Sequence, residues 1–375
     1  MIKTDETPYL IYTKTHPGMK GKQNEDRFGI SAFKLSKDNP EPILLAILSD
    51  GIGGHRAGEV AAEIVVENIS ARISEAQDLN EPLLLLQQAV TEASQSVYEE
   101  SLKDFGRTGM GATCACVLMK GKQLFIASVG DSRIYLLRNK KLIQLSTDHT
   151  WIQEALDAGL IQAQDVNGHP NAHVIRRYLG AAQAPEVDFR LKLHSYEDDQ
   201  AQINNQGQIL FPDDVVFQCS DGLTDLVSDQ EIGSILEHKN LDDALNQLTG
   251  LANTRGGHDN ITMVAIKITK NGKHKSKKRK RWIGLLIIFL LILTILAGLA
   301  FAEFGLPYFN KVLNPTSGQQ IVLSPTTPSI TPNPSKSAST PIPEQNQPLV
   351  VPTNPTLVLT PKATPILWPT NTQSP

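Results

Sequence analysis

The chain has 375 residues, a formal net charge of −4 and 40% hydrophobic residues. This length allows one large domain or two ordinary ones, and the weak net charge gives no case for a nucleic-acid partner. The three cysteines show neither the spacing of a zinc site nor a disulfide framework. We therefore expect Cys114, Cys116 and Cys219 to be buried, reduced thiols.

Composition changes sharply along the chain and divides it into four parts. Residues 1–270 mix apolar, charged and glycine residues as a globular domain does, and residues 271–281 form a basic juxtamembrane linker with seven Lys and Arg residues. Residues 282–302 are 21 positions without a charge, and residues 303–375 are rich in Pro and Thr, with fifteen of the chain's 23 prolines. Only the first part is long enough to build a sizeable core.

The uncharged segment 282–302 predicts a transmembrane helix, because about 20 apolar residues span a hydrocarbon core of roughly 30 Å. A buried helix of the globular domain is the alternative, but the segment has no polar face. Residues 1–10 lack the apolar core of a secretory signal, and the basic linker places its side of the membrane in the cytoplasm. We expect a single-pass plasma-membrane protein that contacts the lipid bilayer, with residues 1–270 cytoplasmic and a disordered, extended tail outside.

In chain order, the first predicted strand starts just after Glu25 and Asp26, and a buried strand then ends just before Asp50. Two amphipathic helices are predicted over 57–73 and 82–102, because apolar residues recur there at three- and four-residue spacing. The second of these helices opens with a proline, which suits a position whose backbone amide is unpaired anyway.

The middle of the chain predicts hairpins, because its strands are separated by only two or three residues. These strands cover 123–129, 133–138 and 141–145. Shorter helices are predicted over 150–158, 229–237 and 242–253, and further strands end before Asp221 or begin after Asn260. Strands and helices come in groups and do not alternate strictly, which favours an α+β fold with antiparallel sheets covered by helices.

Acidic residues stand at the ends of these predicted strands. For a single Asp-Gly pair a turn is the commoner explanation. Several carboxylates at the rim of one sheet would however repel one another strongly unless cations were present, and Mg²⁺ and Mn²⁺ prefer oxygen ligands. Two such ions about 3.5–4 Å apart can activate a water molecule and neutralise a phosphoryl transition state. The pattern therefore predicts a metal centre.

Six short motifs in a fixed order carry a resemblance to a known family. They are NEDR (24–27), DGIGGH (50–55), MGAT (110–113), VGDSR (129–133), CSDGLTD (219–225) and DNIT (259–262). Together they resemble the metal-dependent Ser/Thr protein phosphatases of the 2C class, also called PPM-type. The segment TDHTWIQEALDAGLI (147–161) is similar to the bacterial branch, and the resemblance covers about residues 9–269.

The resemblance implies a fold, an activity and partners. The fold would be two antiparallel sheets packed face to face with helices on both outer faces. The activity would be hydrolysis of phosphoserine and phosphothreonine in proteins, a phosphoric monoester hydrolase reaction that uses two Mn²⁺ or Mg²⁺ ions. The partners would be phosphorylated proteins, including a bacterial Ser/Thr protein kinase at the same membrane, since anchoring concentrates the enzyme near such a kinase.

The resemblance also implies which residues hold the two ions. Asp50 would bridge both, and Asp26 and the carbonyl of Gly51 would complete one of them. Asp221 and Asp259 would hold the other. These four aspartates would act catalytically through a water molecule bound to the metal pair.

Three further residues receive roles on the same grounds. Asp131, helped by Asp221, matches the acidic residue that binds a third, weaker ion in bacterial members. Asn260 would orient Asp259 behind the metal ligands, and Glu25 belongs to the same supporting set.

Two positions depart from the family pattern. The family has an arginine for substrate phosphate five residues before its first aspartate, where this chain has Gly21 between Lys20 and Lys22. We expect these two lysines to contact phosphate, although a lysine supplies a point charge and no bidentate fork. Eukaryotic members have a histidine after the Asp-Gly pair as the proposed general acid, and this chain has Ile52 there, with His55 three residues later.

The segment from about 147 to 180 is expected to form a flap beside the site. It carries several candidate cations that either contact substrate or belong to a solvated loop surface, namely His149, His169, His173, Arg176 and Arg177.

Three alternative functions stay open. A pseudophosphatase would lack metal aspartates, and none is missing from the six motifs. A membrane sensor whose outer tail does the work is compatible with catalysis inside. A phosphatase for small metabolites is less consistent with a flap beside a shallow acidic rim.

Overall fold

The computed structural model describes residues 1–270, except residues 5, 22, 37, 54–56 and 167, and also the backbone of the short strand β15 (His274–Lys275). Within these residues no helix is both long and apolar enough to cross a membrane. The predicted transmembrane segment 282–302 and tail 303–375 lie outside the described residues. The same holds for most of the linker 271–281, and for Lys22 and His55.

The first of two main sheets has six antiparallel strands in the order β1-β4-β5-β8-β9-β12. Its long central strand β5 is a continuous apolar run, as expected for a strand covered on both faces. The strands are β1 (Ile2–Lys3), β4 (Arg27–Lys34), β5 (Pro42–Ser49), β8 (Cys114–Lys120), β9 (Gln123–Val129) and β12 (Gln208–Ile209).

The second main sheet has five antiparallel strands in the order β11-β10-β13-β14-β3. The strands are β3 (Tyr9–His16), β10 (Arg133–Arg138), β11 (Lys141–Gln144), β13 (Val215–Cys219) and β14 (Ile261–Ile268). Two small sheets complete the set. One pairs β6 (Gly51–Ile52) with β7 (Gly111–Ala112), and the other pairs β2 (Glu6–Thr7) with β15.

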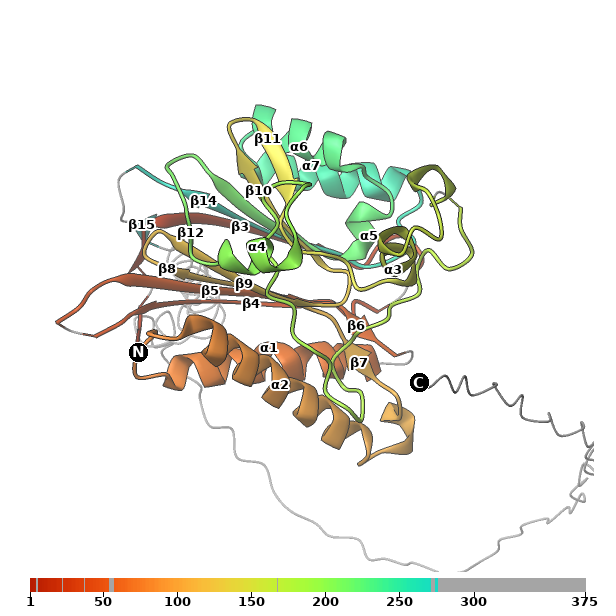
Figure 1. The fold of residues 1–375 in the computed structure, drawn as a ribbon, viewed down its shortest axis with the longest axis horizontal. Coiled ribbons are helices and arrows are strands. Elements are labelled where there is room, and N and C mark those ends of the chain that lie inside the picture. The colour runs from red at the N-terminus through yellow and green to blue at the C-terminus, as the bar shows by residue number, and fades with distance from the viewer. Residues whose placement is uncertain are drawn as a thin grey trace, which may run out of the picture. The chain divides into compact units, whose positions relative to one another are not determined.

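Helices cover the outer face of each main sheet, as Figure 1 shows. Helices α1 (Ala57–Glu75) and α2 (Pro82–Ser101) pack on the first sheet, and α5 (Asp221–Thr224), α6 (Asp229–His238) and α7 (Leu241–Thr254) pack on the second. The remaining helical segments lie in connections: η1 (Phe105–Arg107), α3 (Trp151–Asp157), η2 (Ala163–Asp165) and α4 (Asp199–Asn204).

The core follows from the two-residue period of the strands. In β5, Leu44 and Leu48 point into the layer between the sheets, while Ile43 and Ile47 point toward α1 and α2. All four are fully or almost fully buried, and each contributes about 1.5–3 kcal/mol of hydrophobic stabilisation. This arrangement confirms the α+β fold with two antiparallel sheets between outer helices.

The longer predicted helices are present with ends shifted by at most two residues. Pro82 stands at the start of α2 as expected. The sequence analysis did not predict α4 and α5, which have six and four residues, too short for a clear helical period. Cys114, Cys116 and Cys219 are free and buried, as expected, and burial raises the pKa of each thiol.

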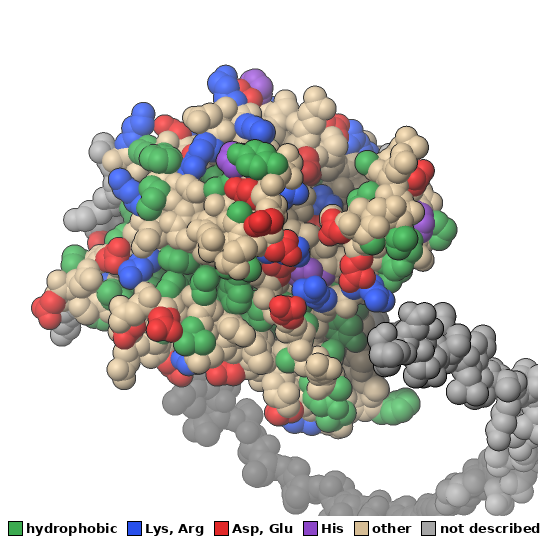
Figure 2. All heavy atoms as spheres, viewed as in Figure 1, with side chains coloured by type: hydrophobic (Ala, Val, Ile, Leu, Met, Phe, Trp, Pro, Cys, Tyr) green, Lys and Arg blue, Asp and Glu red, His purple; other side chains and the backbone are tan. Residues whose placement is uncertain are grey.

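On the face of the molecule in Figure 2, the Lys and Arg side chains alternate with Asp and Glu side chains, and small apolar areas lie between them. This mixture agrees with the weak net charge of the chain.

Candidate metal centre

Asp50 stands at the end of β5 and is fixed through its backbone. Its N–H donates to Thr113 Oγ1 at 2.9 Å, and its C=O accepts from the Thr113 N–H at 2.8 Å. The next residue, Gly51, pairs with Ala112 across the β6–β7 ladder. The rigid end of the sheet thus determines where the Asp50 carboxylate lies.

Only glycine fits at position 51, because helix α1 approaches the backbone closely there. A Cβ atom at this position would lie 2.1 Å from the carbonyl oxygen of Gly58, in the first turn of α1. Glycine at both positions lets the helix start directly against the strand end. The carbonyl of Gly51 therefore belongs to a segment with almost no freedom to move.

Asp26 precedes β4 and is 3% exposed. Its Oδ2 accepts a hydrogen bond of 2.9 Å from the Ser220 hydroxyl, which lies at the end of β13 in the other sheet. Its Oδ1 is also buried but has no hydrogen-bond partner. A buried carboxylate oxygen without a partner is costly, and it is an oxygen that a cation would satisfy.

Asn260 connects two of the candidate ligands. Its backbone N–H donates to Asp259 Oδ1 at 2.9 Å, and its side-chain Oδ1 accepts from the Glu25 N–H at 2.7 Å. Its Nδ2 donates to the carbonyl of Pro17 at 3.2 Å. Asn260 is 4% exposed and holds the segment before Asp26 as well as Asp259.

Asp131 occupies the turn between β9 and β10 and is 7% exposed. Burial raises the pKa of Asp131 well above its usual range, and the nearby charges of Asp221 and Asp148 raise it further. Asp131 and Asp221 therefore lie within electrostatic reach of each other, as two ligands of one weak ion would.

The carboxylates of the cluster affect one another's pKa values. Burial raises the pKa of Asp26 to about 7 and that of Asp221 to about 6, and in both cases the charge of Asp259 adds to the effect. The pKa of Asp50 is raised well above its usual range by burial and by the charges of Asp26, Asp221 and Asp131. Five aspartates from both sheets are thus linked by their electrostatic effects on one another.

Such a cluster fits divalent cations. Among the described residues, no three His, Cys, Asp or Glu side chains are already grouped closely enough to enclose an ion. The charges of the neighbouring aspartates nevertheless raise the pKa values of Asp26 and Asp50, and Asp26 Oδ1 is buried without a hydrogen-bond partner. Like charges this close cannot all ionise without a compensating charge, and Mg²⁺ or Mn²⁺ supplies it with the oxygen ligands it prefers.

The candidate phosphate contacts are only partly described. Lys20 is exposed, and Gly21 has φ +68°, with no heavy atom within 4 Å of the point where a Cβ atom would lie. An arginine at position 21 would have room, but it would be strained by the left-handed backbone.

The flap folds back on itself. Its base is a short antiparallel contact in which the Trp151 N–H donates to the Val174 carbonyl at 2.9 Å and the Arg176 N–H donates to the His149 carbonyl at 2.8 Å. Trp151 stacks on His169 with 4.8 Å between ring centroids. The flap therefore has an internal structure.

Of the flap cations, His149 lies differently from the prediction, whereas His173 lies on the exposed surface of the loop. His149 is 4% exposed, and its Nδ1 accepts a hydrogen bond, so it is neither a surface residue nor a free cation; the prediction for it was wrong. His173 is exposed, and its Nδ1 lies 3.1 Å from Asp225 Oδ2. Through Asp225, which follows Asp221 by one helical turn, the flap reaches the carboxylate cluster.

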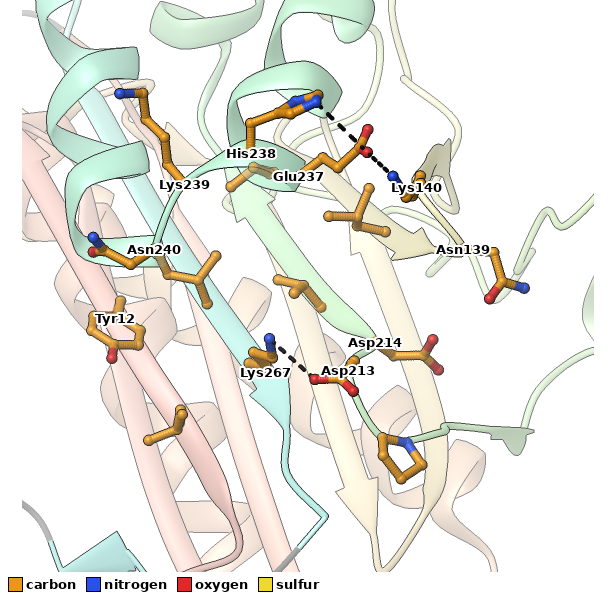
Figure 3. Close-up of a pocket in the computed structure, with 16 residues that line it drawn as sticks. Tyr12, Asn139, Lys140, Asp213, Asp214, Glu237, His238, Lys239, Asn240 and Lys267 are labelled. Atoms are coloured by element: carbon orange, nitrogen blue, oxygen red, sulfur yellow. Dashed lines mark ion pairs between the residues drawn. The ribbon is translucent and has the colours of Figure 1, made fainter.

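A cleft of about 600 Å³ lies at the opposite end of the second sheet (Figure 3). It is lined where β10 and β14 end and β13 begins, whereas the aspartates stand at the other ends of these strands. Two ion pairs lie in this cleft, with Lys140 2.9 Å from Glu237 and Lys267 3.2 Å from Asp213. This cleft is therefore separate from the candidate metal centre.

Three polar residues near the cluster could not be assigned from the sequence. Thr113 lies in the motif MGAT (110–113), but its bond to the backbone of Asp50 depends on strand pairing. Ser220 and Asp225 flank Asp221 in the motif CSDGLTD, and their polar side chains next to a predicted ligand were the available signal.

Comparison with known proteins shows which family the chain resembles. Residues 18–155 match the family model "Protein phosphatase 2C". The chain is 34% identical over 270 residues to the serine/threonine phosphatase stp of Listeria monocytogenes, covering 70% of this chain and 98% of that protein. It is 31% identical over 225 residues to the serine/threonine protein phosphatase PstP of Mycobacterium tuberculosis, covering 60% of this chain and 40% of that protein.

Solved structures show the same fold. The serine/threonine phosphatase of S. agalactiae superposes with a TM-score of 0.59 at 30% identity, covering 69% of this chain and 99% of that one. The catalytic domain of PstP, solved in complex with two manganese ions, gives a TM-score of 0.56 at 27% identity over 71% of this chain and all of that one.

Proposed function

Since this chain belongs to the protein phosphatase 2C family of bacterial Ser/Thr phosphatases, we propose that the five converging aspartates are its catalytic metal centre. The chain is a protein-serine/threonine phosphatase of a metal-dependent family. The observation that carries the proposal is the buried, unpartnered Oδ1 of Asp26 among carboxylates whose pKa values are raised by one another.

Each ligand has a place in the proposal. Asp50 would help to hold both ions, Asp26 and the Gly51 carbonyl would hold one, and Asp221 and Asp259 would hold the other. When bound, two Mn²⁺ or Mg²⁺ ions would supply the charge that activates water and offsets the phosphoryl group.

The residues of the chain that support these ligands act by holding them still. Thr113, just before β8, fixes Asp50, and Ser220, just after β13, fixes Asp26. Asn260 binds both Asp259 and the backbone N–H of Glu25, the residue before Asp26. Three supports come from three different strand ends, so the ligands are preorganised by the rigid sheets. A third, weaker ion is proposed at Asp131, next to Asp221.

Direct counting of bound metal tests this assignment. Isothermal titration of the full chain, purified in detergent and stripped with chelator, should show two tight Mn²⁺ ions and one weaker ion. Asp26→Asn should remove one tight ion while leaving the fold intact. Two tight ions in Asp26→Asn would show that Asp26 is not a ligand.

We also propose that the enzyme works at the cytoplasmic face of the plasma membrane, anchored by residues 282–302. The seven Lys and Arg residues of the linker support this orientation. The described chain ends in β15, which pairs with β2 near the start of β3, whereas the aspartates lie at the other end of β3 and β14. Strand β15 therefore lies at the end of the sheets opposite to the candidate metal centre, which supports access of a phosphorylated protein to that centre.

The proposed counterpart is a membrane Ser/Thr protein kinase and the proteins that it phosphorylates. A shared membrane raises the local concentration of both enzymes around the same substrates. Loss of residues 271–375 should leave phosphatase activity on a soluble phosphopeptide unchanged and slow the dephosphorylation of a membrane-embedded kinase. Equal rates on the kinase with and without these residues would contradict the proposal.

A further inference from the structure

The turn that carries Asp131 packs against Thr113. Gly130 has φ +103°, and a Cβ atom there would lie 2.6 Å from Thr113 Cγ2. On the other side of Asp131, the Ser132 hydroxyl lies 2.8 Å from Thr113 Oγ1, the same oxygen that accepts from the Asp50 N–H. The position of this turn is therefore coupled to that of Asp50.

His149 binds both backbone groups of Gly130. The Gly130 N–H donates to His149 Nδ1 at 3.0 Å, and the His149 N–H donates to the Gly130 carbonyl at 2.9 Å. His149 is 4% exposed, so water does not compete for these bonds. His149 thus holds both the N–H and the C=O of Gly130, the residue directly before Asp131.

The hydrogen bonds also determine the tautomer of His149. Because Nδ1 accepts from Gly130, the proton of the neutral ring is on Nε2, which donates to Asp188 Oδ2 at 3.0 Å. Arg190 holds the Asp188 carboxylate in turn, with its Nη2 at 2.6 Å from Oδ2. The backbone of Asp188 pairs with Ser128 of β9 through bonds of 2.9 and 3.0 Å.

We propose that His149 is a positioning residue for the third metal ion. Asp188 determines the tautomer of His149, and His149 Nδ1 holds the Gly130 N–H so that the Asp131 carboxylate faces Asp221. The inference rests on the proposed role of Asp131 as a ligand of the weaker ion. A buried His149–Asp188 pair held by the partly exposed Arg190 is a costly way to gain stability alone, because apolar residues of similar volume are often at least as stabilising. This chain of contacts ends at Gly130, the residue before the candidate ligand Asp131, and this position gives the chain of contacts a function beyond stability.

Asp188→Asn is the first test, measured as Mn²⁺ titration of the full chain in detergent. If the new amide turns its NH₂ toward His149 Nε2, that nitrogen must accept, and the ring proton moves to Nδ1 against the Gly130 N–H. If the new amide instead turns its oxygen toward His149 Nε2, its NH₂ group faces the guanidinium of Arg190. We expect the weakest Mn²⁺ ion to lose about ten-fold or more in affinity, within the range known for such supporting residues, while the two tight ions keep theirs.

Two substitutions of His149 separate its contacts. His149→Asn leaves an amide oxygen near the position of Nδ1, which can accept from Gly130, but does not reach Asp188. His149→Gln reaches toward Asp188 but leaves the Gly130 N–H without its acceptor. We expect His149→Asn to retain the weak ion better than His149→Gln. The reverse order would overturn the proposal.

Asp214→Asn is the matched control. Asp214 is 4% exposed and binds Arg138 with Nη2–Oδ2 at 2.6 Å, the same distance as in the Arg190–Asp188 pair. It lies at the cleft of Figure 3, at the far end of the second sheet. Asp214→Asn should lower the thermal unfolding temperature like Asp188→Asn and leave all Mn²⁺ affinities unchanged. An equal loss of the weak ion in both variants would show general destabilisation and overturn the proposal.

Asp131→Asn separates the failure of this inference from that of the proposed metal centre. If Asp131→Asn removes the weak ion and Asp188→Asn leaves it at wild-type affinity, the positioning role of His149 is wrong and the assignment of Asp131 stands. If Asp131→Asn itself leaves all three ions bound, Asp131 is not a ligand, and both the assignment and the positioning role fall.

Discussion

The Ser220 hydroxyl donates a hydrogen bond of 2.9 Å to Asp26 Oδ2, although the two residues lie 194 positions apart in the chain. Ser220 ends β13 of the second sheet, and Asp26 precedes β4 of the first. The same hydroxyl oxygen accepts from the Thr262 N–H at 3.0 Å. One buried hydroxyl therefore joins the two sheets at the centre of the carboxylate cluster.

Ser220→Ala should weaken metal binding more than catalysis at saturating metal. Asp26 would lose the donor that orients it, so we expect the Mn²⁺ concentration for half-maximal activity to rise roughly ten-fold. The Thr262 N–H would also lose its acceptor, which costs about 1–3 kcal/mol of unfolding free energy. Phosphate release from a phosphothreonine peptide, measured against Mn²⁺ concentration, checks the first effect.

Ser146→Ala is the control for this variant. Ser146 is buried, and its hydroxyl accepts from the Ile134 N–H at 2.9 Å, so its loss also leaves a backbone donor unpaired. It should lower stability without changing the Mn²⁺ dependence. The same Mn²⁺ shift in both variants would contradict a specific role of Ser220.

Asp188 should make the domain sensitive to acid. Burial alone would raise the pKa of this carboxyl, but hydrogen bonds from His149 and Arg190 outweigh burial and hold the pKa well below its usual range. The unfolded chain binds this proton near pH 4, so the contribution of the carboxylate to stability is complete above that pH and is lost progressively below it.

Urea unfolding at a series of pH values checks this prediction. The difference in unfolding free energy between wild type and Asp188→Asn should stay constant from about pH 8 to pH 6 and shrink below about pH 4. A difference that increases toward acid pH would mean that the pKa of Asp188 is raised by folding.

The lysines before the first candidate ligand should affect substrate binding. Lys20→Ala and Lys22→Ala are each expected to raise KM for a phosphopeptide with little change in kcat, because a lysine there attracts phosphate equally in the ground and transition states. Gly21→Arg should lower KM and cost about 1 kcal/mol of stability at φ +68°. Unchanged KM in all three variants would mean that these side chains do not contact phosphate.

The membrane orientation predicts a protease pattern. In the proposed orientation the seven basic residues keep the amino-terminal flank of 282–302 in the cytoplasm, so protease added to intact spheroplasts should remove the tail 303–375 and spare residues 1–270. Immunoblots against each end of the chain check this. Digestion of residues 1–270 in intact spheroplasts would show the opposite orientation, and release by a high-salt wash would show that the segment does not span.

The sequence predicted the features that have a local cause. The strand period and the acids at strand ends placed Asp26, Asp50 and Asp221 correctly at the rim of the sheets, since each position depends on its immediate neighbours. Apolar spacing gave α1 and α2 within two residues.

Features that depend on distant contacts could not be predicted. The sequence around His149 is polar, which suggested a surface cation, but its burial comes from Asp188 and from the fold of the flap onto residues 174–176. The bond between Ser220 and Asp26 likewise exists only because two sheets pack face to face. The four-residue helix α5 after β13 was too short to give a period.

The measurement that tests the metal centre most directly is phosphate release from a phosphothreonine peptide by the full chain, with Mn²⁺ and with chelator, for wild type, Asp50→Asn and Asp259→Asn. We expect wild-type activity only with Mn²⁺ or Mg²⁺, and loss of at least about 100-fold in each variant, because each removes a carboxylate from the proposed metal pair. Circular dichroism should show both variants folded. Full wild-type activity in chelator, or a wild-type rate in Asp259→Asn, would contradict the account.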